Sequence, residues 1–232
     1  MDVIRCVALF TVLSVHFFSK VGLYGITITG KKMYCVMILR TFFMICVPLF
    51  VMLTGYLMRK KELNRQYYSK IWHVIWIYVL ASLACVGYRI FFKHEILGLK
   101  DIISGLLNYS LAPYGWYIEM YIGLFVIIPF LNVLYNHLDS RKKKVFLIVV
   151  MLFLTSVGDV VNVYNFETAG WWQHPRLSGE YQKLLPFWWG GCYPITYYFI
   201  GCYLNEFGMR IKKTYNLMLI FFSTIVFGTY NF

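Results

Sequence analysis

The segment DVIRCVALFTVLSVHF (2–17) is mainly apolar but contains ionisable residues, which a membrane tolerates poorly. Arg5 and His16 lie eleven positions apart in it. In a helix, eleven residues return to within about 20° of the starting direction and rise about 16 Å. The two side chains are therefore predicted to share one face. An ionisable group inside a membrane helix indicates a functional site by default.

The composition of the whole chain agrees with a membrane location. Hydrophobic residues make up 60% of the chain and charged residues only 14%, with a mean hydropathy of +0.62. Ordinary soluble domains carry about 25% charged residues. The first apolar run has no basic leader and no small-residue cleavage site, so it is predicted to be a retained span rather than a signal peptide.

Seven apolar segments approach or exceed the roughly 17–25 residues that a membrane-spanning helix needs. We therefore predict an all-α, polytopic transmembrane helical bundle. The second segment is longer than a span requires, which predicts a tilt. The predicted spans are 3–19, 33–58, 71–92, 114–135, 145–163, 187–204 and 214 to the chain end.

Basic residues cluster in alternate connections between the apolar segments. The net charge is +12, and the basic runs fall in 59–70, 136–144 and 205–213. This is the pattern of loops held on the cytoplasmic side. It predicts a cytoplasmic N-terminus and the lipid bilayer as a partner. It also argues against binding of nucleic acid.

Two of the connections on the other side have features of their own. Residues 99–110 alternate apolar and polar side chains at helical spacing, which predicts a short interfacial helix. Residues 164–186 combine tryptophans, His174 and mixed charges. That composition suits either a membrane-interface belt or a surface on which sugars stack.

Arg40 and Glu119 are two further ionisable residues within predicted spans, both about 10 Å from the outer surface at 1.5 Å per residue. A charge at the membrane centre costs about 2.5–3.5 kcal/mol, and a salt bridge between the two would offset much of it. They either pair two helices or line a polar cavity. Alternatives also hold for the first helix: Arg5 could reach the cytoplasmic headgroups, and His16 could bond a neighbouring helix.

The sequence contains no pattern typical of a metal site or of a serine-hydrolase active site. The six cysteines are scattered without a CxxC pair, and no two histidines have ligand spacing on one helix. We predict no metal site. There is also no GxSxG nucleophile turn and no phosphate-binding glycine-lysine loop.

Four motifs in order resemble the acyltransferase-3 family of integral membrane acyltransferases. Its first helix carries a basic residue, ten intervening positions and a histidine, as Arg5 and His16 do. VPLFVMLTGYLM (47–58) resembles its second helix, and WYIEMYIGLFVIIPFLN (116–132) and YPITYYFIGCYL (193–204) resemble later ones. Members have about ten spans. We therefore expect residues 1–232 to be a single membrane acyltransferase domain, incomplete at the C-terminus.

The resemblance implies transfer of an acyl group, acetyl by expectation, from cytoplasmic acyl-CoA to a hydroxyl of a cell-surface or envelope glycan. Acetyl-CoA would be a co-substrate, with no bound cofactor, and the chain would lie in the plasma or inner membrane. Arg5 suits a CoA phosphate. His16 suits the general base. Acceptor-side roles fall to Arg40, Glu119, Trp116 and Tyr121.

A different class remains open, namely a small-molecule transporter or exporter, which would also use intramembrane Arg, His and Glu. Against it, no inverted repeat and no pair of broken half-helices is evident. Labelled acetyl-CoA discriminates the two, because only acyl transfer consumes it. A purely structural scaffold is a third interpretation.

Overall fold

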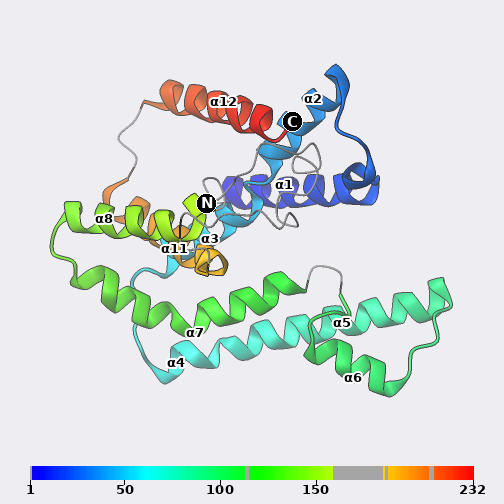
Figure 1. Cartoon of the computed structure of the whole chain (residues 1–232). Helices are drawn as coiled ribbons and strands as arrows, with labels where there is room; N and C mark the ends of the chain where they lie inside the picture. The colour runs from blue at the N-terminus through cyan, green and yellow to red at the C-terminus, as the bar shows by residue number, and fades with distance from the viewer. Residues whose placement is uncertain (1, 113–114, 159–184, 186–187, 209–211) are drawn as a thin grey trace. The chain divides into compact units, whose positions relative to one another are not determined.

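The computed structural model describes residues 2–112, 115–158, 185, 188–208 and 212–232, and its regular elements there are helices (Figure 1). No strand occurs among these residues, so the all-α prediction is confirmed. They form two compact units, Met1–Met58 with Ser140–Phe232, and Arg59–Asp139. That the two make a single domain stays a prediction.

Four segments of the described chain are long and apolar enough to cross a membrane, and they correspond to the first four predicted spans. They are α1 (Asp2–Lys20), Gly30–Met58, Arg65–Lys93 and α7 (Trp116–His137). The last three predicted spans correspond to the shorter helices α8 (Arg141–Leu152), α11 (Tyr193–Phe207) and α12 (Lys213–Tyr230). A π-helical turn, Phe153–Val157, continues α8. Asp159, the rest of span 145–163 and almost all of 164–186 lie outside the described residues.

The second predicted span contains a break that the sequence prediction missed. It consists of α2 (Gly30–Phe43) and α3 (Cys46–Met58), separated by a turn at Met44 and Ile45. Pro48 explains the position of the break. Proline has no N–H to donate to the carbonyl four residues earlier, here that of Met44, and its ring collides with that carbonyl in a continuous helix.

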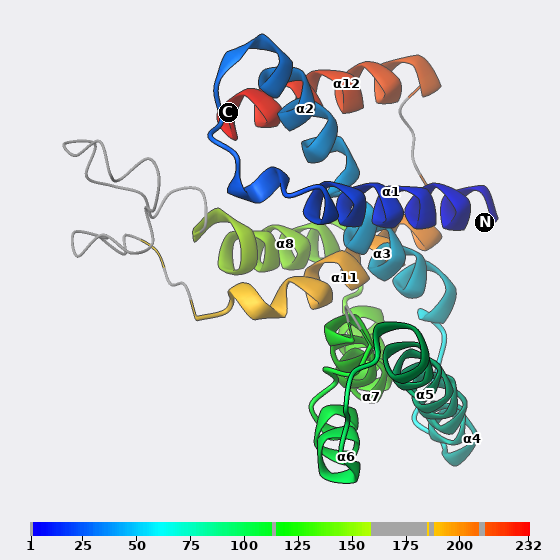
Figure 2. The same ribbon diagram turned by 90° about the vertical axis from the view of Figure 1, so that its right-hand side faces the viewer.

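In the first unit, α3 and α11 lie side by side (Figure 2). Two glycines bring their backbones into contact. A Cβ atom added to Gly55 would collide with the carbonyl oxygen of Tyr198, and one added to Gly201 with that of Met52. Small residues allow this close approach in membrane helices, where dispersion contacts replace the hydrophobic effect. Cys202 also directs its Sγ to the Gly55 carbonyl at 3.5 Å.

The N-terminal and C-terminal helices complete this unit. α1 packs on α3, and Ala8 and Thr11 are its buried residues. α12 packs on α2 (Figure 2), where the hydroxyls of Tyr34 and Thr229 share a hydrogen bond of 2.8 Å. Segments at opposite ends of the chain are therefore neighbours.

The second unit consists of α4 (Arg65–Ser69), α5 (Ile71–Lys93), α6 (Leu99–Leu107) and α7. Pro129 lies inside α7, so the Phe125 carbonyl lacks its usual helical donor. The Tyr67 hydroxyl of α4 donates to that oxygen at 2.6 Å, and the Tyr67 ring stacks on Phe125 at 4.3 Å. The Tyr68 hydroxyl donates to the next carbonyl, that of Val126, at 3.0 Å. Tyr67 therefore compensates for the proline.

The helix predicted over 99–110 is confirmed as α6. Its first turn is closed by Asp101, whose carboxylate accepts the Gly98 N–H at 3.1 Å. Leu99, Ile103 and Leu107 are exposed on one side of α6, whereas Tyr78 of α5 donates to the Leu106 carbonyl at 2.8 Å. The apolar exposed side suits an interfacial helix; the interfacial location itself stays a prediction.

Candidate active site

α1 positions the two residues that the sequence singled out first. The helix runs unbroken from Asp2 to Lys20, so the helical register places Arg5 and His16 on the same face, about 16 Å apart along the axis. The buried residues Ala8 and Thr11 point about 60–140° away from Arg5 and His16. The shared face therefore lies beside the buried stripe of α1 and is not part of it.

Arg5 is accessible and held locally. Its side chain is 54% exposed, and Nη1 donates to Asp2 Oδ1 at 2.9 Å. An exposed ion pair contributes only about 0–1 kcal/mol. An anionic ligand can therefore displace Asp2 at little cost, while Asp2 keeps the guanidinium oriented in the ligand's absence. This arrangement suits phosphate recognition.

His16 is half-buried, in contrast to Arg5. Phe18 lies about 200° around the helix from it, and its ring packs against Phe43 of α2 with centroids 6.0 Å apart. Aromatic packing thus occupies the opposite side of α1. The His16 imidazole therefore lies on the same side of α1 as Arg5.

Arg40 and Glu119 fall in different units. Arg40 is half-buried in the last turn of α2, and Glu119 is exposed in the first turns of α7. Their ion pair stays a prediction. The structure shows another source of stability for the carboxylate, because a negative charge near a helix N-terminus interacts favourably with the helix dipole.

Trp116 and Tyr121 are both on α7 but in different surroundings. Trp116 is 46% exposed, whereas Tyr121 is half-buried between Tyr117 and Phe125, with ring centroids at 6.5 and 6.2 Å. Trp116 and Glu119 are three residues apart, so both project from neighbouring positions of one helical face. An exposed indole beside a carboxylate is a combination that can bind a sugar ring.

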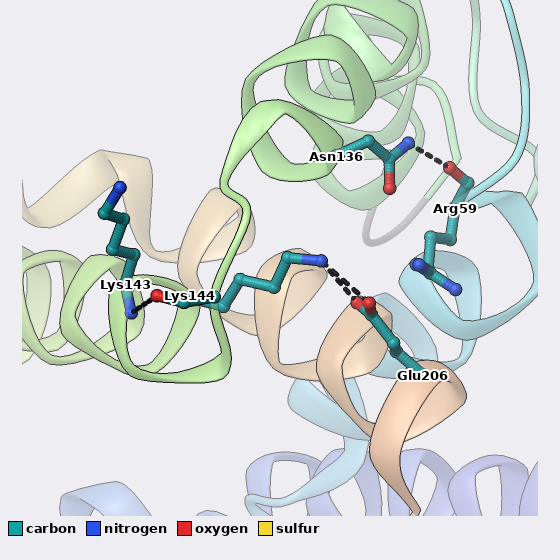
Figure 3. Close-up of polar contacts among 6 residues, drawn as sticks. Arg59, Asn136, Lys143, Lys144 and Glu206 are labelled. Carbon is teal, nitrogen blue, oxygen red and sulfur yellow. Dashed lines mark hydrogen bonds and ion pairs between the residues drawn. The ribbon is translucent and has the colours of Figure 1, made fainter.

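A buried ion pair was missed by the sequence reasoning. Lys144 of α8 is 6% exposed, and its Nζ lies 2.8 Å from both carboxylate oxygens of Glu206 on α11 (Figure 3). Beside it, Arg141 Nε donates to the Tyr203 hydroxyl at 2.7 Å. The charge pattern places Lys144 in the basic connection 136–144, whereas the structure buries its side chain. The available signal was its position as the last lysine of the run, directly before the apolar stretch that starts at Val145.

Within the described residues, no three His, Cys, Asp or Glu side chains come together in a group able to hold a metal ion. The candidate site itself offers an imidazole, a guanidinium and a carboxylate. Arg5 and His16 lie on one helix, α1. Another helix, α7, carries Glu119, Trp116 and Tyr121.

Comparison with known proteins identifies the family. A family model described as an acyltransferase domain matches residues 1–232, the whole chain. No curated protein and no solved structure matches this chain. A full-length family match on a fold of spanning helices shows that this multi-pass membrane protein belongs to the acyltransferase-3 family.

Proposed function

We propose that the chain transfers an acyl group, acetyl by expectation, from cytoplasmic acyl-CoA to a hydroxyl of an envelope glycan. The observation that carries the proposal is the pairing of Arg5 and His16 on one face of an unbroken apolar helix, in a chain of an acyltransferase family. The family match also supports acyl transfer over transport.

His16 serves as the general base in this proposal. Its neutral imidazole accepts the proton of the acceptor hydroxyl as that oxygen attacks the thioester carbonyl. A C–O bond forms and the C–S bond breaks. The imidazolium then returns the proton to the departing CoA thiolate, so the side chain ends neutral and ready for another cycle.

Arg5 binds a phosphate of the CoA arm. A guanidinium is permanently charged and binds phosphate oxygens through two parallel hydrogen bonds. It lies near the predicted cytoplasmic end of α1, where acyl-CoA arrives. The axial separation of about 16 Å between Arg5 and His16 lets an extended CoA arm bring its thioester close to the imidazole.

The acceptor glycan binds on the opposite side of the membrane in this proposal, at the N-terminal end of α7. Support comes from the exposed Trp116 and the exposed Glu119 one turn further on. The indole stacks on the sugar ring, and the carboxylate accepts hydrogen bonds from the sugar hydroxyls. Tyr121, half-buried on the same helix, adds a second aromatic ring for the acceptor. The role of Arg40 in this proposal is to stabilise negative charge that develops on the carbonyl oxygen.

The test is transfer of labelled acetyl from acetyl-CoA to envelope glycan by membranes containing the chain. His16→Ala should reduce transfer at least about 100-fold, the usual contribution of a general base. The control is His94→Asn, which removes an exposed imidazole from a left-handed residue that asparagine also tolerates. Full transfer by His16→Ala would remove the base assignment. Uptake without consumption of acetyl-CoA by the wild-type chain would favour the transporter.

A further inference from the structure

The second unit contains a concave pocket of about 510 Å³, a volume within the range of small-molecule sites, roughly 300–1,000 Å³. One wall is the segment that follows α3, and the other is the C-terminal half of α7. It is separate from every residue assigned above. Its lining residues are Lys60, Lys61, Glu62, Leu63, Pro129, Asn132, Val133, Asn136 and His137.

The backbone around the pocket is held in place from both sides. Asn132 of α7, 3% exposed, donates from Nδ2 to the Lys61 carbonyl at 2.7 Å. Asn136, one turn later, donates to the Arg59 carbonyl at 3.4 Å (Figure 3). At the far end, Asn64 caps α4 by accepting the Tyr67 N–H at 2.7 Å. The pocket is therefore preformed, which lowers the entropic cost of binding.

The lysine side chains stay available while their backbone is fixed. Lys60 and Lys61 are exposed, and in the described part of the chain neither ammonium group has an ion-pair partner. The pocket lining includes the two lysines and one carboxylate, that of Glu62. The excess positive charge favours an anionic ligand, and a lysine ammonium is a common phosphate ligand.

The remaining lining fits the rest of a nucleotide. Leu63, Pro129 and Val133 offer an apolar surface for a flat base. Asn136 and Glu62 offer polar atoms of the kind that bind the edge of adenine. A phosphate group next to an adenine-sized apolar surface is the chemistry of one end of coenzyme A.

We propose that this pocket binds the 3′-phosphoadenosine end of acyl-CoA, with the 3′-phosphate on Lys60 and Lys61 and the adenine against Leu63, Pro129 and Val133. The inference rests on the proposed function, because that function supplies acyl-CoA as the donor. It names the subsite for the 3′-phosphate, which the proposed function leaves unassigned.

The probes are CoA and dephospho-CoA, which lacks the 3′-phosphate, bound to the chain in nanodiscs and measured by calorimetry. The wild-type chain should bind CoA about tenfold more tightly, equivalent to about 1.4 kcal/mol. Lys60→Gln with Lys61→Gln should abolish that preference. Lys142→Gln with Lys212→Gln, which removes equal charge from other exposed lysines of predicted cytoplasmic segments, should retain it. Equal affinity for both probes in the wild type, or a preference that survives in the Lys60/Lys61 variant, overturns the inference.

A lipid headgroup could supply the same phosphate chemistry, so nanodiscs with and without phosphatidylglycerol form a second arm. Displacement of CoA by this lipid from the wild type but not from the Lys60/Lys61 variant would assign the pocket to lipid and overturn the inference. His16→Ala separates the two proposals, because it should bind CoA normally and transfer acetyl at least about 100-fold more slowly. A 3′-phosphate preference without any acyl transfer by the wild type would leave the pocket standing and refute the proposed function. Acyl transfer by a wild-type chain that shows no preference for the 3′-phosphate would support the proposed function and refute the pocket assignment.

Discussion

The ion pair between Lys144 and Glu206 makes the sharpest prediction about stability. Changing Glu206 to glutamine keeps the shape of the side chain but leaves the Lys144 ammonium, 6% exposed, without its counter-ion. At 2.8 Å and an effective dielectric constant of about 20, the lost attraction is roughly 6 kcal/mol. Two effects reduce this loss. The glutamine amide keeps a hydrogen bond, and the variant avoids the free-energy cost of desolvating the Glu206 carboxylate, whose side chain is 21% exposed. We therefore expect a net loss of about 3 kcal/mol, the lower end of the range for broken buried pairs.

Equilibrium unfolding by SDS in mixed micelles, followed by tryptophan fluorescence, measures this loss. Lys144→Met in the Glu206→Gln background should recover at least about 1 kcal/mol, because the uncompensated ammonium is gone. Lys142→Gln, an exposed neighbour, should change stability by less than about 0.5 kcal/mol. Strict additivity of the Lys144 and Glu206 substitutions, or a Glu206→Gln cost below about 1 kcal/mol, would refute the reasoning.

The other predictions concern a proline, a glycine and the candidate phosphate ligand. Tyr67→Phe should cost about 1–3 kcal/mol of unfolding free energy in the same assay by removing a donor from a buried carbonyl. Pro129→Ala should restore most of it by supplying the missing N–H; no rescue would contradict the compensation. Gly201→Ala should lower the unfolding free energy by about 1–3 kcal/mol, because its Cβ collides with the facing backbone. The control Gly123→Ala, which has open space at its Cβ, should be neutral or stabilising. Equal effects of the two substitutions would contradict the close packing. Arg5→Ala should raise the KM for acetyl-CoA with a modest change in kcat, and unchanged kinetics would remove its phosphate role.

The sequence by itself determined the class of fold and the register of the first helix. A chain with so little charge has to satisfy its backbone hydrogen bonds without water, and helices do so within each segment. Hence the first four spans were predicted close to where the structure has them, and the shared face of Arg5 and His16 followed from the helical repeat. Pro48 was also visible, and its spacing from Met44 could have predicted the break between α2 and α3.

Tertiary structure alone decided the features that join distant parts of the chain. Lys144 and Glu206 are 62 residues apart, and Tyr67 and Phe125 are 58 apart, so no local pattern predicts their contact. The pocket likewise needs Asn132 to fix the backbone of Lys61, 71 residues earlier. A local pattern reports how a segment bonds with itself, whereas the partner of a buried charge or carbonyl depends on which helices the packing brings together.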